Sequence, residues 1–123
     1  MNIPKLKTAI TDLIEFRTRK EGHIQVYHPF YKLDGDGLTV YYYNKNGKRW
    51  FSDAGGSYIA LSLHFSYRQL EGKTRQKYIK AACVHHKLIE DKGRFKRYIE
   101  DDEDIGMAYF DFIHGLIRIN TIL

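Results

Sequence analysis

Apolar residues follow two different periods along the chain, and each change of period marks a new element. Residues 4–20 carry apolar side chains at helical spacing, which predicts an amphipathic N-terminal helix with Pro4 in its first turn and Gly22 at its end. The apolar members of this helix are Leu6, Ile10, Leu13 and Ile14. Residues 23–28 alternate between polar and apolar side chains, which predicts a strand stopped by Pro29.

The clearest local pattern is a β-hairpin formed by residues 38–45 and 48–53. The two strands are joined by Asn46-Gly47, a dipeptide that readily takes the two positive φ angles of a type I′ turn. This turn fixes the register, so Tyr43 should lie opposite Trp50, Tyr42 opposite Phe51 and Val40 opposite Asp53. One face then carries Leu38, Val40, Tyr42 and Phe51, and the other carries Thr39, Tyr41, Tyr43 and Trp50.

The second half of the chain predicts mainly helices. Ser57 can cap a short helix that runs to about Ser66, and residues 73–87 form a longer helix. The inward side of the longer helix should carry Tyr78, Ile79, Ala82 and Cys83. Residues 87–100 suggest a small hairpin that turns near Asp91-Lys92-Gly93. Residues 102–121 form a last helix that is apolar nearly all round, with acidic residues at its start.

These elements predict a single α+β domain over residues 1–123. Its parts are an N-terminal helix, a three-stranded antiparallel sheet, a basic middle helix, a small second hairpin and an apolar C-terminal helix. The length suffices to bury a core without disulfides, and the single Cys83 excludes an internal disulfide or a CxxC motif. Without a membrane-length apolar run or a secretory signal, we expect a cytoplasmic protein with no membrane contact.

Charge is unevenly distributed along the chain. The net charge of +5 results from +10 over residues 1–99 and −5 over residues 100–123, where Arg118 faces six acidic side chains. A basic body with a short acidic block suits a polyanionic partner such as nucleic acid, although lysine-rich surfaces also simply keep small domains soluble.

Two groups of residues are candidates for contact with that partner. In the predicted helix, Lys73, Lys77, Lys80 and Lys87 share one face, and Arg75, Arg94, Lys96 and Arg97 lie near them in the sequence. This face could follow a phosphate backbone or could be an ordinary solvated surface. In the hairpin, Tyr41, Tyr43 and Trp50 could stack on bases, flanked by Lys45, Lys48 and Arg49. Alternatively, a helix covers these aromatic residues and they belong to the core.

Other polar residues allow weaker interpretations. Asp34, Asp36 and Asp53 could together bind a divalent metal, as a nuclease requires, but turn formation and a helix start also explain them. Asp111, His114 and Arg118 lie on one stripe of the last helix, which is either a buried polar site or its solvated side. The side chains of the adjacent His85 and His86 diverge on a helix, which disfavours a shared zinc ion. Cys83 is interpreted as a small buried hydrophobic residue. No motif for nucleotide binding or nucleophilic catalysis is present, so we expect no enzyme and no cofactor.

Three segments resemble a known family: Ile24–Phe30, Leu38–Tyr43 and Trp50–Gly55. This chain is similar to short bacterial and phage proteins grouped as the domain of unknown function numbered eighteen twenty-eight. The family's Leu-Thr-Asp-Asp-Gly-like step into a helix reads here as Phe51-Ser52-Asp53-Ala54-Gly55, so Ala54 replaces the second acid. The loop Lys32–Asp36 differs too, where the family tends to have an Arg-His-Asn-Asp-like run. The resemblance implies an α+β fold and a phage or mobile-element setting, and it supplies no activity.

Together these patterns predict a non-catalytic binding module whose basic surface engages nucleic acid or a nucleic-acid-bound complex. In a phage setting, such a module could act as an accessory protein or as an inhibitor of host defence. The alternatives are a protein-interaction or homodimerisation domain that uses the apolar C-terminal helix, and a metal-dependent nuclease that uses the three aspartates.

Overall fold

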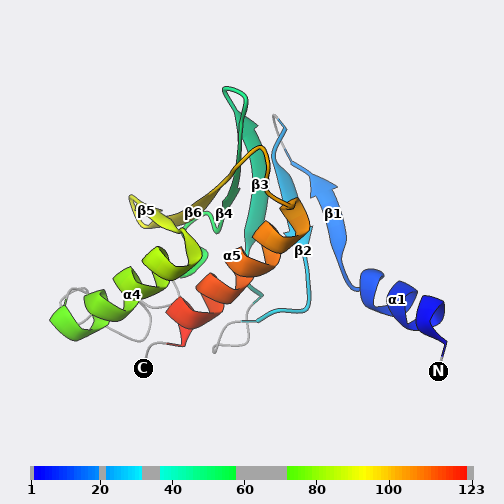
Figure 1. Ribbon diagram of the computed structural model, residues 1–123, viewed down its shortest axis with the longest axis horizontal. Coiled ribbons are helices and arrows are strands. Elements are labelled where there is room, and N and C mark those ends of the chain that lie inside the picture. The colour runs from blue at the N-terminus through cyan, green and yellow to red at the C-terminus, as the bar shows by residue number, and fades with distance from the viewer. Residues whose placement is uncertain (1, 20–21, 32–36, 58–71, 122–123) are drawn as a thin grey trace.

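The computed structural model describes residues 2–19, 22–31, 37–57 and 72–121 and has an α+β architecture (Figure 1). The elements are α1 (Ile3–Thr11), β1 (Glu15–Thr18), β2 (Ile24–Tyr27), β3 (Val40–Lys45), β4 (Lys48–Ser52), α4 (Lys73–His86), β5 (Ile89–Asp91), β6 (Arg94–Ile99) and α5 (Ile105–Asn120). The strands form one antiparallel sheet of six in the order β1-β2-β3-β4-β6-β5. The predicted class is confirmed, whereas a sheet of three strands was an undercount.

The hairpin of β3 and β4 has the predicted register. Tyr43 pairs with Trp50 and Tyr42 pairs with Phe51, while Tyr41 pairs with Ser52 at the end of the ladder. Asn46 and Gly47 have φ angles of 55° and 77°, as a type I′ turn requires. The two-residue turn therefore sets which side chains share a face throughout the centre of the sheet.

The N-terminal segment differs from the prediction, because it contains a helix and a strand. Helix α1 is capped by the Asn2 side chain, which accepts a hydrogen bond of 3.1 Å from the Lys5 amide, and the helix ends at Thr11. From Glu15 the chain pairs with β2, with Phe16 opposite Val26. Ile14, Phe16 and Thr18 fit the period of two that a strand needs, so a helix over 4–20 was wrong.

The remaining strands join the same sheet because β6 pairs with β4. Trp50 lies opposite Tyr98 and Phe51 lies opposite Arg97 in that ladder. The small hairpin predicted over 87–100 is therefore β5 and β6, and it extends the central sheet. The short helix predicted from Ser57 to Ser66 lies, apart from Ser57, outside the described residues.

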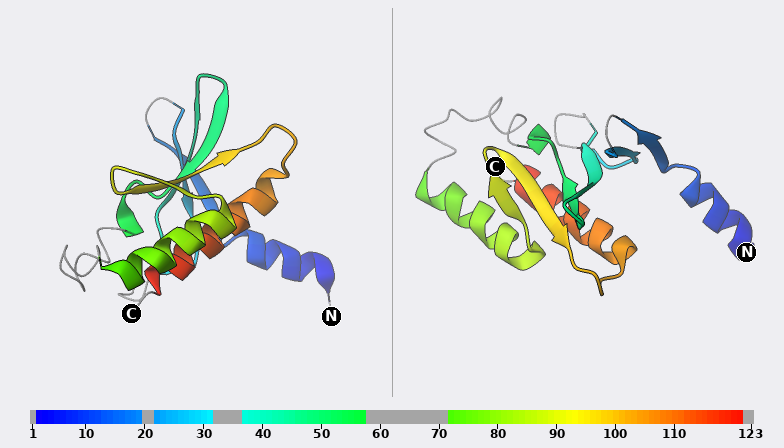
Figure 2. Two further views of the ribbon diagram at one scale, coloured as in Figure 1. Left: turned by 60° about the vertical axis from the view of Figure 1, so that its left-hand side comes forward. Right: turned by 90° about the horizontal axis from the view of Figure 1, so that it is seen from above.

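The core lies between one face of the sheet and helices α4 and α5, which lie on the same side of it (Figures 1 and 2). We call this side the inner face. Its fully buried side chains are Val40, Phe51, Phe95 and Ile99 from the sheet and Ile79, Ala82, Phe112, Leu116 and Ile119 from the helices. Tyr78 was predicted to point inward but is 62% exposed. Helix α5 begins at Ile105, three residues later than predicted, because Asp104 caps it by accepting a hydrogen bond from the Met107 amide.

The end of β4 is held by the buried carboxylate of Asp53. Its Oδ1 accepts hydrogen bonds from the Gly55 and Phe95 amides, both at 2.9 Å, and its Oδ2 accepts one from the Ser57 amide at 3.1 Å. A buried charge is tolerated when such donors surround it. Asp53 thus fastens the turn after β4 to the start of β6.

We expect Asp53→Ala to lower the free energy of unfolding by about 3 kcal/mol or more, because three amide groups lose a charged acceptor. Urea denaturation followed by circular dichroism measures this loss. The exposed Asp101→Ala is the control and should change stability by no more than about 0.5 kcal/mol. Equal stability of the two variants would contradict the structural role assigned to Asp53.

Candidate nucleic-acid interface on the outer face of the sheet

The face of the sheet opposite α4 and α5 carries a row of aromatic side chains, and we call it the outer face. Strand alternation places Tyr41 and Tyr43 of β3, Trp50 of β4 and Tyr98 of β6 on this side. All four side chains are half-buried. Because α4 and α5 cover the other side, the possibility that one of them buries Tyr41, Tyr43 and Trp50 in the core is excluded (Figure 2).

Trp50 lies at the centre of this row. It is directly opposite Tyr43 on β3 and Tyr98 on β6, and its ring centroid is 5.3 Å from that of Tyr98. The Tyr43 ring extends the row to His23, with centroids 5.1 Å apart. These cross-strand neighbours hold the rings side by side on three adjacent strands, which is the arrangement of a stacking platform.

Cationic side chains lie on the same face around the rings. Lys45 and Lys48 are paired at the tip of the hairpin, and the Lys48 ammonium lies 5.8 Å from the centroid of the Tyr98 ring. Alternation along β6 puts Arg94 and Lys96 on this face too. Lys96 donates a hydrogen bond of 3.0 Å to Asp91, and this bond raises the pKa of the lysine and lowers that of the aspartate.

The far end of the outer face carries two arginines and one glutamate, and Glu15 of β1 forms an ion pair of 3.5 Å with Arg17. The Arg17 guanidinium lies 4.6 Å from the centroid of the Tyr27 ring, and Arg19 lies 5.8 Å from it. Arg19 also donates a hydrogen bond of 3.0 Å to Gln25. Arg17 and Arg19 were not predicted as site residues, because residues 15–18 were assigned to the N-terminal helix. The alternation of Glu15, Arg17 and Arg19 with Phe16 and Thr18 was the signal that could have found them.

Two of the predicted phosphate contacts lie on the inner side instead. Arg97 is only 3% exposed, and it forms ion pairs with Glu103 at 2.7 Å and with Asp111 at 3.2 Å. Burial alone would lower the pKa of Arg97, but the two carboxylates outweigh it and raise the pKa. Arg49 donates a hydrogen bond of 2.9 Å to the Glu100 carbonyl. Alternation therefore assigns the adjacent residues Lys96 and Arg97 to opposite sides of the sheet, and Arg97 serves the fold.

The polar stripe of α5 faces α4 and contacts a buried histidine. His86 donates from Nδ1 to Asp111 at 2.8 Å, while Arg118 donates to its Nε2 at 3.2 Å. Since a guanidinium can only donate, Nε2 must accept, which assigns the neutral tautomer with hydrogen on Nδ1. His114 is exposed, with its ring 4.9 Å from that of His86. Asp111 and Arg118 thus link the two helices.

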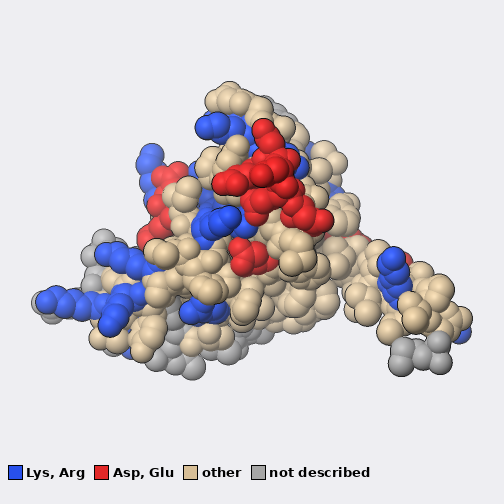
Figure 3. All heavy atoms as spheres, viewed as in Figure 1, with Lys and Arg blue, Asp and Glu red and all other residues tan. Residues whose placement is uncertain are grey.

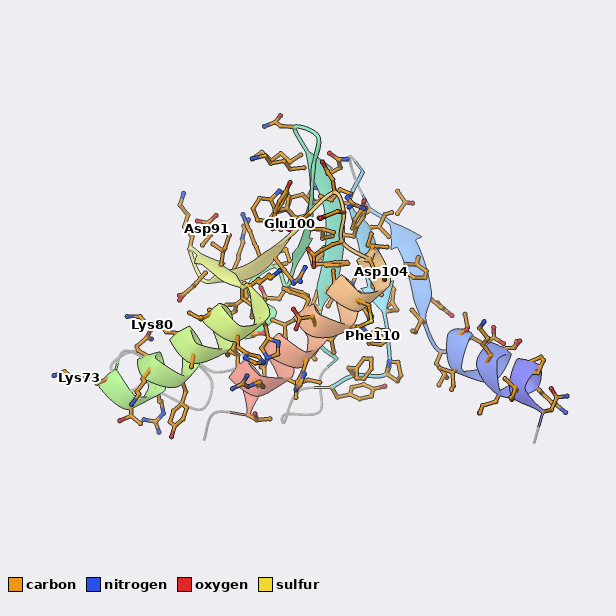
Figure 4. The ribbon with its side chains drawn as sticks, in the orientation of Figure 1. Lys73, Lys80, Asp91, Glu100, Asp104 and Phe110 are labelled. Carbon is orange, nitrogen blue, oxygen red and sulfur yellow. The ribbon has the colours of Figure 1, made fainter. Side chains whose placement is uncertain are left out.

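The basic residues of α4 form a separate surface. Lys73, Lys77 and Lys80 are exposed on the side of the helix turned away from the core, and no ion pair within the described residues neutralises them (Figure 4). Figure 3 shows Lys and Arg atoms gathered around α4, whereas the acidic atoms gather where β6 leads into α5. Arg75 is half-buried, and Lys87 caps the helix with a φ angle of 57°. The lysine stripe is therefore shorter than predicted and lies on the other side of the sheet from Trp50.

The structure gives little support to a metal site. Both carboxylate oxygens of Asp53 already accept amide hydrogen bonds, while Asp34 and Asp36 lie outside the described residues. Within the described part of the chain, no three His, Cys, Asp or Glu side chains are grouped as metal ligands. Cys83 is half-buried, and burial and the nearby Glu90 raise the pKa of its thiol to about 11, so it stays protonated at neutral pH.

The fold and this face define a small α+β domain in which the described helices α4 and α5 leave one aromatic and basic sheet face uncovered. Residues 28–119, about three quarters of the chain, match the family described as Domain of unknown function DUF1828. The chain therefore belongs to this family, and the resemblance seen in its strands is confirmed. No curated protein and no solved structure matches the chain. Among the described residues, no helix has the length and apolarity needed to cross a membrane.

The pair of Glu103 with Arg97 predicts a dependence of stability on pH. The hydrogen bond from Arg97 holds the pKa of Glu103 below its ordinary value of 4.5. The carboxylate therefore stabilises the fold above that value, and this contribution is lost as the pH falls through the lower pKa of the folded state. Glu103→Gln should cost about 1–3 kcal/mol at neutral pH and progressively less in acid.

Urea denaturation at a series of pH values between about 7 and 3 measures this difference. The exposed neighbour Asp102 provides the control, and Asp102→Asn should follow the wild type across the series. A gap between wild type and Glu103→Gln that stays constant with pH would disprove the contribution assigned to this ion pair.

Proposed function

We propose that this protein is a non-catalytic module that binds single-stranded nucleic acid on the outer face of its sheet. The observation that carries the proposal is the row of Tyr43, Trp50 and Tyr98 on three adjacent strands, with lysines and arginines at both ends. Every base has an aromatic face, so such a row can bind bases without reading their sequence. The surrounding cations would neutralise phosphates and add a salt-dependent contribution.

The outer face suits this role better than the lysines of α4. Lys73, Lys77 and Lys80 offer charge alone, and the nearest large apolar side chain on their stripe is the aliphatic Val84. The outer face offers charge and rings together, and rings on adjacent strands can stack on successive bases of a single strand. The lysines of α4 would then add to the general attraction for a polyanion.

The family resemblance also points to the biological setting of this binding, a phage or another mobile element. If the protein acts in a phage or mobile element, binding through this face would let it occupy a channel or surface meant for DNA or RNA. A complex of protein and nucleic acid would be an equally suitable partner, because both the rings and the cations can engage an exposed single strand.

Trp50 is the only tryptophan of the chain, so its fluorescence reports on this face alone. Stacking on a base should quench it when unlabelled oligothymidylate or oligouridylate is added at low salt. Trp50→Leu keeps an apolar residue in the strand and should weaken binding by about 1–3 kcal/mol, measured by polarisation of a labelled oligonucleotide. Absence of binding to both DNA and RNA at low salt would refute the proposal. Binding without quenching of the Trp50 fluorescence would show that the binding site lies on another surface.

A pair of charge variants separates the outer face from α4. Lys45→Ala with Lys48→Ala and Lys73→Ala with Lys77→Ala each remove two exposed lysines, so the two double variants have the same net charge. We expect the first to weaken binding more strongly and to flatten the dependence of log K on log salt by about 1.4, since a single strand releases about 0.7 counterion per neutralised phosphate. Polarisation titrations at several salt concentrations measure both quantities. A larger effect of the α4 pair would contradict binding at the outer face.

A further inference from the structure

Helix α1 is an amphipathic helix whose apolar side is left exposed by the described part of the chain. It projects away from the sheet and the other described helices (Figure 1), and none of its residues is buried. Its apolar residues recur at spacings of three and four and are 49% to 70% exposed: Ile3, Leu6, Ile10 and Leu13. A nine-residue helix with a continuous apolar stripe is marginal in water by itself and normally gains its stability from packing.

An apolar groove of about 290 Å³ lies on the inner side of the sheet, next to the first turns of α5. Strands β1 and β2 form one wall, with Phe16 and Val26 among its residues. Helix α5 forms the other wall, with Ile105 and Phe110. Phe16 and Phe110 are 68% and 52% exposed, which is unusual for residues that line a concave apolar site.

The charges around these two surfaces are opposite. Helix α1 carries Lys5 and Lys7 and no acidic residue between Ile3 and Thr11. Ile105 lines the groove, and exposed Asp104 directly precedes it in the chain (Figure 4). Asp101 and Asp102, shortly before it in the sequence, are exposed as well. A helix with the chemistry of α1 therefore suits the groove both by its apolar stripe and by its charge.

The turn after α1 directs the helix away from the groove of its own chain. The Leu13 and Ile14 amides donate hydrogen bonds of 3.1 and 3.0 Å to the Ile10 and Thr11 carbonyls, which closes that turn. Ile14 and Phe16, which follow at once, already lie in the groove wall. With this turn in place, no described element of the same chain covers the apolar stripe of α1.

We propose that the occupant of the groove is α1 of a second copy of this chain. Each copy would insert its α1 into the partner's groove. The two α1–groove contacts are then equivalent by a two-fold axis, and both apolar stripes and both grooves are covered. The groove lies on the inner side of the sheet, and the dimer would leave both outer faces free. This proposal therefore does not depend on nucleic-acid binding.

The first experiment measures the mass of the full chain by light scattering at several micromolar concentrations. We expect a dimer for the wild type and a dissociation constant raised by about 30-fold or more when a lysine is placed in either surface, by Leu6→Lys or Phe110→Lys. Both positions are about half exposed, so the fold should tolerate the change. Thr8→Lys on the polar side of α1 and Val84→Lys on exposed α4 are the controls and should remain dimeric.

A second experiment tests which chain supplies the helix. A tagged chain with Leu6→Cys is mixed with an untagged chain with Phe110→Cys, both carrying Cys83→Ala, and the mixture is treated with diamide to oxidise paired thiols. We expect a mixed disulfide between the two chains. A monomeric wild type, a dimer that withstands both lysine variants, or the failure of the two single-cysteine chains to form a mixed disulfide would each overturn the proposal.

Discussion

Successive side chains of a strand point to opposite faces of a sheet, and in this protein that constraint decides the role of nearly every residue in the centre of the fold. Helix α5 packs on one face, so Val40, Phe51 and Phe95 must be apolar and are buried there. Their neighbours in the sequence then face the other way. The aromatic and basic outer face is thus a direct counterpart of the core, and a shift of register by one residue would exchange the two.

Buried charges complete the core and fix its edges. Asp53 gathers amides from the turn after β4 and from β6, and Arg97 joins β6 to the segment before α5 and to α5 itself. A charge in such a place is costly unless its partners are well positioned, so these contacts constrain geometry more than they add stability. They also explain the acidic block before α5, part of which faces an arginine of the same chain.

The sequence was most informative where local chemistry is decisive. Asn46-Gly47 fixes the hairpin register by its backbone angles alone, and the faces of β3 and β4 followed from it. The helix prediction for the N-terminal segment extended too far because Leu6, Ile10 and Leu13 fit a helix. The change to a period of two after Ile14 is short and was taken as part of that helix. The position of Arg97 depends on β6 pairing with β4, which is a contact between distant segments that no local pattern reveals. The same pairing brings Tyr98 beside Trp50, so the contribution of Tyr98 to the candidate site could not be foreseen.

The alternation of β6 divides its side chains into two sets that contact different neighbours and can be substituted independently. Lys96 and Tyr98 can be replaced without disturbing the packing of Phe95, Arg97 and Ile99, because the two sets share a backbone but contact different neighbours. The residues of the proposed interface and the residues that stabilise the core therefore occupy alternating positions of one strand, and substitutions in the two sets can accumulate independently. A single-residue insertion within the strand is the exception. It would reverse the alternation beyond the insertion, so that core residues would face the outer side and outer residues would face the core.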